Sequence, residues 1–293
     1  YTAADKTGGE YTTGVTTAGT PGSSGAYTQI VVAASAPTLF YQCSVHAGMG
    51  GQANTNSTLG SSNFDGAIQS VAKANTTAGF SIVAYTGNGQ NNTDVTIGHS
   101  IGIAPQVVIV KNRDSAKRWQ VFHNKLTSGK NILLNSTNAE STYTSYIKEV
   151  SSTTFTVRDV DSNDNANVNK SGDDYIAYVF SEVAGFSKFG SYTGNGSSDG
   201  TFVFTGFSPA WVMVKRTNDT DNWSIYDISR DTTNVMGSEL FANVANAEQS
   251  NSSDIDFVSN GFKFRRNYTS NNGAGTFVYF AFAESPFRNA RAR

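Results

Sequence analysis

Apolar residues recur in short runs of strand length, and no long stretch repeats them with the period of a helix. Residues 154–158 alternate apolar and polar side chains, as a strand with one buried face does. Residues 106–110 are an apolar run of strand length, which favours a central strand buried on both faces. The pattern predicts an all-β protein. Further strands are expected at residues 27–32, 38–41, 80–85, 119–122, 173–180, 202–204, 211–214, 223–226, 261–264 and 276–282.

The sequence Tyr-Thr-Gly-Asn-Gly occurs twice, beginning at Tyr85 and at Tyr192. Each copy is followed by the same series of recognisable residues in the same order. Three pairs of these landmarks are each separated by 104 positions: Pro105 and Pro209, Lys111 and Lys215, and Trp119 and Trp223. This constant spacing indicates a tandem duplication.

The duplication divides the chain into four parts. Residues 79–184 and 185–293 are predicted to be two tandem antiparallel β-sandwiches of jelly-roll type, because each consists of short strands separated by turn-forming residues. Residues 1–52 form a small β-rich piece. Residues 53–78 are rich in Gln, Asn, Ser, Thr, Ala and Gly, which is typical of a linker, with one marginal helical stretch at 64–72.

Composition narrows the classes of partner. Charged residues make up 15% of the 293 residues and the formal net charge is −2, which argues against nucleic acid, a partner that needs clustered Lys and Arg. The single cysteine excludes an internal disulfide. No run approaches the roughly 18 apolar residues of a membrane span, so none is expected.

Cys43, His46 and Met49 place a thiolate, an imidazole and a thioether close together after a predicted strand. Type 1 copper sites use these three ligand types, and residues 41–51 resemble the copper-loop hairpin of cupredoxins such as plastocyanin. A cupredoxin needs a second histidine from an earlier strand, and residues 1–42 contain none. The alternative is a partial cupredoxin-like piece that serves as a spacer. No cofactor is expected, except copper if sequence upstream of Tyr1 supplies another histidine.

Catalytic chemistry has little support in the sequence. His99 and His123 lie near no nucleophile motif, so structural roles are favoured and no enzyme activity is expected. The acid-rich residues 159–165 superficially resemble a calcium loop, but Asp164 and Lys170 stand where an EF-hand requires Gly and Glu. A polar hairpin loop is the favoured reading there, with weak Ca²⁺ binding as the alternative.

Trp119 and Trp223 are candidate binding residues, since exposed indole rings stack on sugars. Asp219 and Asp221, in the loop before Trp223, complete this candidate set. The equivalent positions of the two tryptophans favour packing in the core over sugar contact, because a fold that is used twice requires the same core aromatic twice.

Several stretches of eight to eleven residues resemble a known protein family, among them residues 107–114, 186–196 and 280–287. Residues 79–293 resemble a domain of tailed bacteriophages of marine hosts, cyanobacteria among them, where it forms the C-terminal end of large virion proteins. The resemblance implies location in the virion and supplies no catalytic residue. The expected function is that of a virion structural protein in a tail fibre or other appendage, as scaffold or for host attachment. The alternatives are a lectin-like receptor or glycan-binding module and a capsid-surface decoration protein.

The resemblance also implies partners: other virion proteins, and a host-surface glycan or protein. A homo-oligomer is expected, with a trimer favoured because fibres of this kind are usually trimeric. The second unit carries a surplus of aromatic residues that a partner would cover. The competing explanation is that the second unit packs against the first and buries the surplus. The aromatic residues concerned are Phe202, Phe204, Trp211, Phe262, Phe264, Phe277, Phe280, Phe282 and Phe287.

We predict that this chain alone does not form a type 1 copper site, because Cys43, His46 and Met49 lack a fourth ligand. Adding Cu²⁺ to the purified protein should produce no intense blue copper–thiolate absorption in the visible spectrum. The appearance of that band, and its loss in the variant Cys43→Ser, would contradict the prediction.

Overall fold

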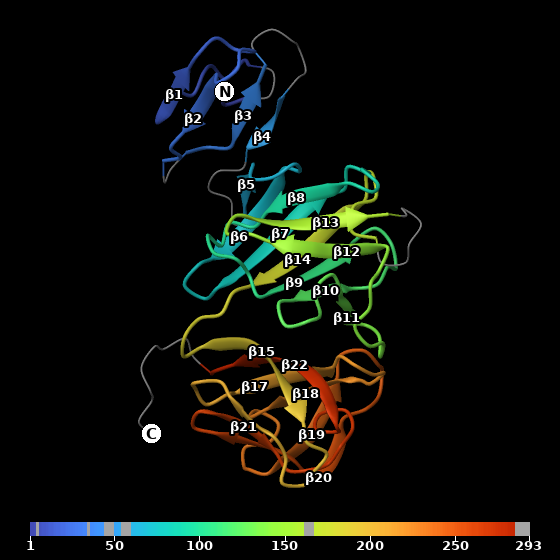
Figure 1. The fold of residues 1–293 in the computed structure, drawn as a ribbon. Helices are drawn as coiled ribbons and strands as arrows, with labels where there is room; N and C mark the ends of the chain where they lie inside the picture. The colour runs from blue at the N-terminus through green and yellow to red at the C-terminus, as the bar shows by residue number, and fades with distance from the viewer. Residues whose placement is uncertain (4–5, 34–35, 44–49, 54–59, 161–166, 285–293) are drawn as a thin grey trace.

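The computed structural model describes residues 1–3, 6–33, 36–43, 50–53, 60–160 and 167–284, and this part of the chain is all-β, as predicted. Three bodies follow one another along the molecule (Figure 1). The N-terminal piece comes first, repeat one extends from β5 to β14, and repeat two extends from β15 to β22.

The N-terminal piece consists of two separate two-stranded sheets. Both pairs, β1 with β2 and β3 with β4, are antiparallel. The piece contacts repeat one through Tyr41, whose ring packs edge-on against Phe64 with centroids 5.6 Å apart. The Tyr41 hydroxyl also donates to Gln69 Oε1 at 3.1 Å. The strands are β1 (Val15–Ala18), β2 (Tyr27–Ile30), β3 (Leu39–Gln42) and β4 (Gly50–Ala53).

Repeat one is built from two antiparallel sheets. Seven strands pair in the order β11-β10-β9-β14-β7-β6-β5, and three pair in the order β12-β13-β8. The strands are β5 (Ser61–Asn63), β6 (Ser70–Asn75), β7 (Phe80–Thr86), β8 (Asp94–Gly98), β9 (Val107–Asn112), β10 (Gln120–His123), β11 (Ile132–Leu133), β12 (Ser145–Val150), β13 (Thr154–Asp159) and β14 (Asp174–Phe180).

The linker predicted for residues 53–78 is wrong over much of its length. Residues 61–63 and 70–75 are strands β5 and β6, and β6 pairs along the whole of β7 up to Tyr85. The helical stretch predicted at 64–72 is absent. Ile68, Ser70 and Ala72 are buried in alternation, so the segment does have the period of a strand. The polar side chain of Ser70 and the small side chain of Ala72 hid that period.

Repeat two reproduces the arrangement of repeat one. Strands β18-β17-β22-β15 lie in the same order as β10-β9-β14-β7, and β20-β21-β16 in the same order as β12-β13-β8. In repeat two, β19 also pairs with β20, which joins everything into one eight-stranded sheet. The strands are β15 (Ser187–Gly194), β16 (Phe202–Phe204), β17 (Trp211–Arg216), β18 (Trp223–Asp227), β19 (Met236–Phe241), β20 (Gln249–Val258), β21 (Gly261–Phe264) and β22 (Gly275–Phe282).

The strand pairing shows how far the jelly-roll description holds. In the duplicated unit the first strand pairs with the last and the second with the last but one: β7 with β14 and β8 with β13, then β15 with β22 and β16 with β21. This nested pairing is that of a jelly roll. The inner strands differ, because β17 to β20 follow one another as neighbouring antiparallel strands.

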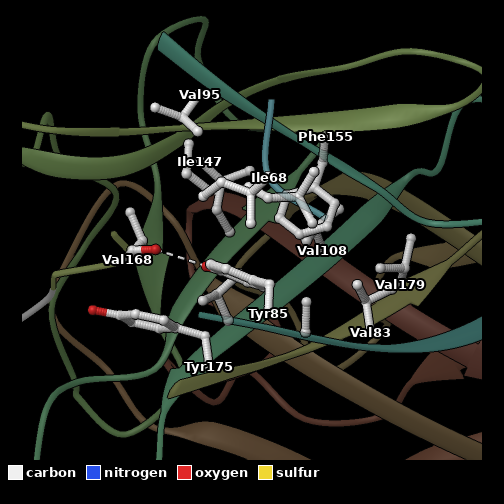
Figure 2. Close-up of a cluster of buried hydrophobic side chains, with 14 of the residues drawn as sticks. Ile68, Val83, Tyr85, Val95, Val108, Ile147, Phe155, Val168, Tyr175 and Val179 are labelled. Atoms are coloured by element: carbon white, nitrogen blue, oxygen red, sulfur yellow. Dashed lines mark hydrogen bonds between the residues drawn. The ribbon is translucent and has the colours of Figure 1, made fainter. Parts of the chain in front are cut away.

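Each repeat has its own apolar core, and a pair of stacked aromatic rings lies in each. In repeat one the rings of Tyr85 and Tyr175 are 5.0 Å apart and nearly parallel, among the valine and isoleucine side chains of both sheets (Figure 2). In repeat two Tyr192 and Phe277 stack in the same way at 4.9 Å.

The repeated Tyr-Thr-Gly-Asn-Gly sequence fastens the end of the unit's first strand to the segment before its last strand. In repeat one the Tyr85 hydroxyl donates to the Val168 carbonyl at 2.7 Å (Figure 2). The backbone N–H of Asn88 donates to Asn169 Oδ1 at 3.0 Å, and Asn169 Nδ2 donates to Asn88 Oδ1 at 2.9 Å. Gly89, at φ +71°, occupies the left-handed region that glycine favours, and its N–H donates to the Asn169 carbonyl at 2.9 Å.

Repeat two contains the same set of bonds, which we call the asparagine lock. The Tyr192 hydroxyl donates to the Asn271 carbonyl at 2.5 Å. Asn272 Oδ1 accepts the Asn195 N–H at 3.4 Å, and Asn272 Nδ2 donates to Asn195 Oδ1 at 3.1 Å. Gly196, at φ +64°, donates its N–H to the Asn272 carbonyl at 2.8 Å. The motif around which the sequence is organised therefore has a structural role in both copies.

We predict that Asn272→Ala lowers the free energy of unfolding by about 2–4 kcal/mol, because it leaves several partly buried backbone groups without partners. The fully buried Asn272 side chain also bonds to the Thr201 N–H and to the carbonyls of Ser197 and Arg266. Urea unfolding followed by tryptophan fluorescence measures the loss. The matched control Asn124→Ala, at an exposed position, should change the value by no more than about 0.5 kcal/mol. Equal effects of the two substitutions would contradict a structural lock.

Candidate functional site

The two repeats pack against each other through a shared apolar cluster, which we call the inter-repeat layer. Repeat one contributes side chains from β9, β10, β11 and β14, on the side that faces β15, β17 and β22 in Figure 1. Its buried members are Val107, Ile109, Val121, Ile132, Phe189, Met213, Trp223 and Phe280. Half-buried residues packed around them are Trp119, Leu126, Leu134, Tyr178, Phe180, Trp211, Ile225 and Phe282.

Strand alternation explains how one sheet serves two cores. In β9, Val108 and Val110 lie in the core of repeat one, whereas Val107 and Ile109 lie in the inter-repeat layer. The same division in β22 assigns Tyr279 to the core of repeat two and Phe280 to the layer. The prediction that residues 106–110 form a strand buried on both faces is confirmed for 107–110, and the second face is covered by the other repeat. Gln106 precedes the strand and is half-buried.

The layer and the core of repeat two together account for most of the aromatic surplus in the second unit. Among the nine residues concerned, Trp211, Phe280 and Phe282 belong to the layer, and Phe262, Phe264 and Phe277 belong to the core of repeat two. Phe202 and Phe204 remain exposed, and Phe287 lies outside the described residues. The packing of one repeat on the other, which was the competing explanation, buries three of the nine residues wholly or in part, and the core of repeat two buries three more. Together they remove most of the argument for a covering partner.

Trp119 and Trp223 occupy equivalent places at this interface. In the pairing of β9 with β10, Gln120 lies opposite Val110. In the matching pairing of β17 with β18, Ser224 lies opposite Val214. Each tryptophan directly precedes this equivalent residue, so the two tryptophans correspond. Trp223 is fully buried and its Nε1 donates to the Leu133 carbonyl of repeat one at 3.0 Å, so its ring has no free face for a sugar. Trp119 is half-buried and stacks on Tyr178 at 6.3 Å.

Polar contacts surround one side of the layer, where the loop after β11 meets the loop between β17 and β18. The Thr137 carbonyl accepts the Asp221 N–H at 2.8 Å and Lys215 Nζ at 3.3 Å. The Glu140 N–H donates to the Thr217 carbonyl at 2.9 Å. Lys215 is fully buried, so this contact is shielded from water. The burial lowers the pKa of Lys215 to about 8.

The two candidate aspartates have different surroundings in that loop. The Asp221 carboxylate accepts the Ser270 hydroxyl and the Asn222 N–H, so it shapes the loop that docks on repeat one. The Asp219 side chain is 62% exposed, with Arg216 Nη1 3.6 Å away. Asp219 is therefore the more exposed of the two, since Asp221 is half-buried.

His123 lies in the interface rather than at a reactive centre. Its Nε2 lies 3.4 Å from the Tyr279 carbonyl of repeat two, and its ring packs edge-on against Phe280 at 5.4 Å. Its Nδ1 accepts the Lys125 N–H at 3.1 Å. Burial, with a smaller repulsion from Lys125, lowers the pKa of His123 to about 4. The ring is therefore neutral at physiological pH.

An apolar cavity of about 210 Å³ opens where the two repeats join. Its aromatic lining comes from both repeats, and the only polar side chains that line it are Ser181 and Ser187. A site of this composition can hold an apolar group, but it supplies no acid, base or nucleophile. The aromatic residues are Phe80, Phe180, Phe186, Phe189 and Phe282.

Residues 53–286 match the family described as Domain of unknown function (DUF7483). The chain belongs to this family. Neither the curated proteins nor the solved structures contain a match. The matched range begins before β5 and ends after β22, so the DUF7483 unit comprises both repeats together with the β5–β6 hairpin.

The metal-like motif lies before the DUF7483 region. His46 and Met49 fall outside the described residues, and so do residues 161–166 of the calcium-like loop. Cys43 is half-exposed, and its carbonyl accepts Lys6 Nζ at 3.0 Å. Among the described residues, no three His, Cys, Asp or Glu side chains are placed to hold a metal ion.

Two other candidates have clear structural contacts. The Asp159 carboxylate accepts the N–H groups of Val168 and Asn169 at 3.0 and 2.8 Å, so it supports the segment that carries the asparagine lock. His99 is buried, with Nδ1 accepting the Ile101 N–H and Nε2 3.2 Å from the Ser151 carbonyl.

The described residues contain no helix long and apolar enough to span a bilayer. The sequence did not reveal that His123, Lys215 and Phe189 lie at the interface of the DUF7483 repeats. The one signal that pointed to this interface was the uninterrupted apolar run at 107–110, because a sandwich sheet with one solvated face alternates.

We predict that acidification destabilises the protein through His123. Its pKa is about 4 when folded and near 6.5 when unfolded, so the unfolded chain binds the extra proton between these values. The free energy of unfolding should therefore fall as pH decreases from 6.5 to 4, by up to about 3 kcal/mol from this group.

The check is the difference in unfolding free energy between the native protein and His123→Gln across that pH range. Glutamine does not titrate, so the variant should lose stability less steeply on acidification. His99, whose pKa is also lowered by burial, is present in both proteins and cancels. Parallel pH profiles would show that His123 is not shielded in the folded protein.

Proposed function

We propose that this DUF7483 chain is a structural module of a bacteriophage particle, part of a tail fibre or another appendage. In that setting it holds neighbouring virion proteins, and through them a host-attachment surface, at a fixed geometry. Its partners are then proteins of the same particle, and its location is the extracellular virion.

The inter-repeat layer is the observation that carries this proposal. Two domains of one chain usually meet through small polar interfaces and move relative to each other. Here aromatic rings of the two repeats pack against each other: Phe180 of repeat one lies 5.9 Å from Phe189 and 6.2 Å from Phe282 of repeat two. Backbone carbonyls of one repeat also accept hydrogen bonds from the other. A stiff two-repeat body suits a load-bearing spacer.

The contacts of the ionisable side chains support the same proposal. The histidines His99 and His123 and the carboxylate of Asp159 are engaged in holding the fold. The sequence resemblance to phage virion proteins in residues 79–293 points in the same direction, and the DUF7483 match covers nearly the same region.

Direct attachment to a host receptor is the second candidate, and Asp219 is the observation that favours it. Its exposed carboxylate lies in the loop between β17 and β18, outside the inter-repeat layer. Trp119, which packs half-buried against the inter-repeat layer, adds an aromatic ring in repeat one. A glycan or a host protein could use such a loop, whereas Trp223 is excluded by its burial.

Immunogold labelling of intact particles with antibodies against the full chain tests the main proposal. We expect label on the tail or on an appendage of the particle. Label over the capsid surface would favour a decoration protein instead. Absence of the chain from purified particles would refute a virion role.

Host-cell and glycan-array binding by the full chain separates a scaffold from an adhesin. A scaffold should show no saturable binding. An adhesin should bind, and binding should weaken in Asp219→Ala while the control Asp65→Ala, in repeat one, retains it.

A further inference from the structure

In repeat one, the outer edge of β8 is covered by the chain's own backbone. The Thr96 carbonyl accepts the N–H groups of Ala67 and Ile68 at 2.9 and 3.1 Å. The Gly98 carbonyl accepts the Ser70 hydroxyl at 2.9 Å. These groups belong to the β5–β6 hairpin, whose second strand also pairs along β7. One hairpin thus covers the free edges of both β7 and β8.

Repeat two has the two corresponding strands without a corresponding hairpin among the described residues. β15 and β16 stand at the two ends of the eight-stranded sheet. The Thr201 hydroxyl donates to the Thr193 carbonyl at 2.8 Å, which ties the start of β16 to β15. From Phe202 onward, the outer edge of β16 makes no hydrogen bond within the described chain.

The pairing with β21 shows which backbone groups face that edge. The Phe264 N–H donates to the Thr201 carbonyl at 3.2 Å, and the Thr205 N–H donates to the Asn260 carbonyl at 3.0 Å. Because backbone groups alternate sides along a strand, the N–H and C=O of Phe202 and of Phe204 point away from β21. They face outward together.

The register relates these residues to the covered edge of repeat one. Phe155 and Phe262 each pack edge-on against the tyrosine of their repeat's lock, at 6.1 and 6.3 Å. Ile97 lies opposite Phe155, and Val203 opposite Phe262. Phe202 therefore corresponds to Thr96, the residue whose carbonyl accepts two N–H groups in repeat one, and Phe204 corresponds to Gly98.

The side chains on this edge are apolar and exposed. Phe202 is 46% and Phe204 62% exposed. Natural proteins usually protect free edge strands with charged residues, proline or a bulge. Residues 200–206 contain no charged residue and no proline, so the edge has neither protection.

We propose that the edge of β16 pairs with the same edge of a second copy of this chain. An antiparallel pair centred on Val203 sets Phe202 of one copy opposite Phe204 of the other. Because both residues present their N–H and C=O outward, each such pair exchanges two backbone hydrogen bonds. The exposed rings then meet as cross-strand aromatic pairs.

A second copy is the occupant that this edge fits best. The strand is self-complementary about Val203, as an isologous twofold contact requires. Since residues 200–206 are uncharged, no like charges oppose each other across the strand pair. The contact also continues the eight-stranded sheet of one copy into that of the next. With only a three-residue strand in each copy, we expect a weak pair of the kind found at the small end of protein interfaces. The pairing is independent of the virion assignment.

Sedimentation equilibrium of the full chain, from micromolar to submillimolar concentration, tests the proposal. We expect a monomer–dimer equilibrium. Phe204→Pro removes an outward N–H from each copy but no bond to β21, so dimerisation should weaken at least about tenfold. The double substitution of Phe202→Ser and Phe204→Ser should also weaken dimerisation. It replaces the proline variant in the test if that variant does not fold.

The matched control is Ile103→Ser, which removes an apolar side chain of 51% exposure from repeat one. Dimerisation should be unchanged in this variant. A native chain that stays monomeric, a native trimer, or equal weakening by Ile103→Ser would each overturn the proposal.

Disulfide trapping tests the register in a Cys43→Ser background, which removes the native thiol. Chains carrying Phe202→Cys are mixed with chains carrying Phe204→Cys and oxidised. In a hydrogen-bonded antiparallel pair the two Cα atoms are about 5.5 Å apart, within disulfide range, so a cross-linked heterodimer should form. A mixture with Ile103→Cys in place of Phe204→Cys should not cross-link. Equal yields from the two mixtures would refute the pairing.

Discussion

The inter-repeat layer is the interaction on which the rest of this structure depends. An antiparallel sandwich sheet normally has one face in its core and one in water, whereas β9 and β22 bury both faces. Burying a large apolar side chain contributes roughly 1.5–3 kcal/mol, and the layer contains eight buried ones. Separating the repeats would expose part of this apolar surface to water, so each repeat contributes to the stability of the other.

The polar groups around the layer take their properties from it. His123 and Lys215 have lowered pKa values because the packed repeats exclude water from them. Their nitrogen atoms lie near the carbonyls of Tyr279 and Thr137 in the opposite repeat. Residues that could serve catalysis in an open cleft thus help to align two rigid bodies.

Duplication has preserved the internal structure and changed the surfaces. Both copies keep the stacked aromatic pair and the asparagine lock. The edges differ, because the β5–β6 hairpin completes repeat one and nothing equivalent precedes repeat two in the described chain. Thr96 and Gly98 lie under that hairpin, whereas Phe202 and Phe204 are open to solvent. The two copies therefore share one fold but differ at this edge, which is covered in repeat one and open to solvent in repeat two.

Local patterns in the sequence determined much of the fold. Strand positions follow from alternation over a few residues, and the duplication follows from a constant spacing, so both were predictable. The β5–β6 hairpin was not, because Ser70 is polar and Ala72 is small, so neither shows that its position is buried.

The candidate site, too, was predictable only where local sequence patterns determine the structure. The sequence indicated that residues 106–110 are buried on both faces and that Trp223 is a core residue, but it could not name what covers them. Alternation specifies which face of a strand excludes water; the identity of the covering surface depends on contacts between residues distant in the chain. Only the tertiary structure could decide that Trp223 packs against repeat one and that Phe202 and Phe204 stay exposed.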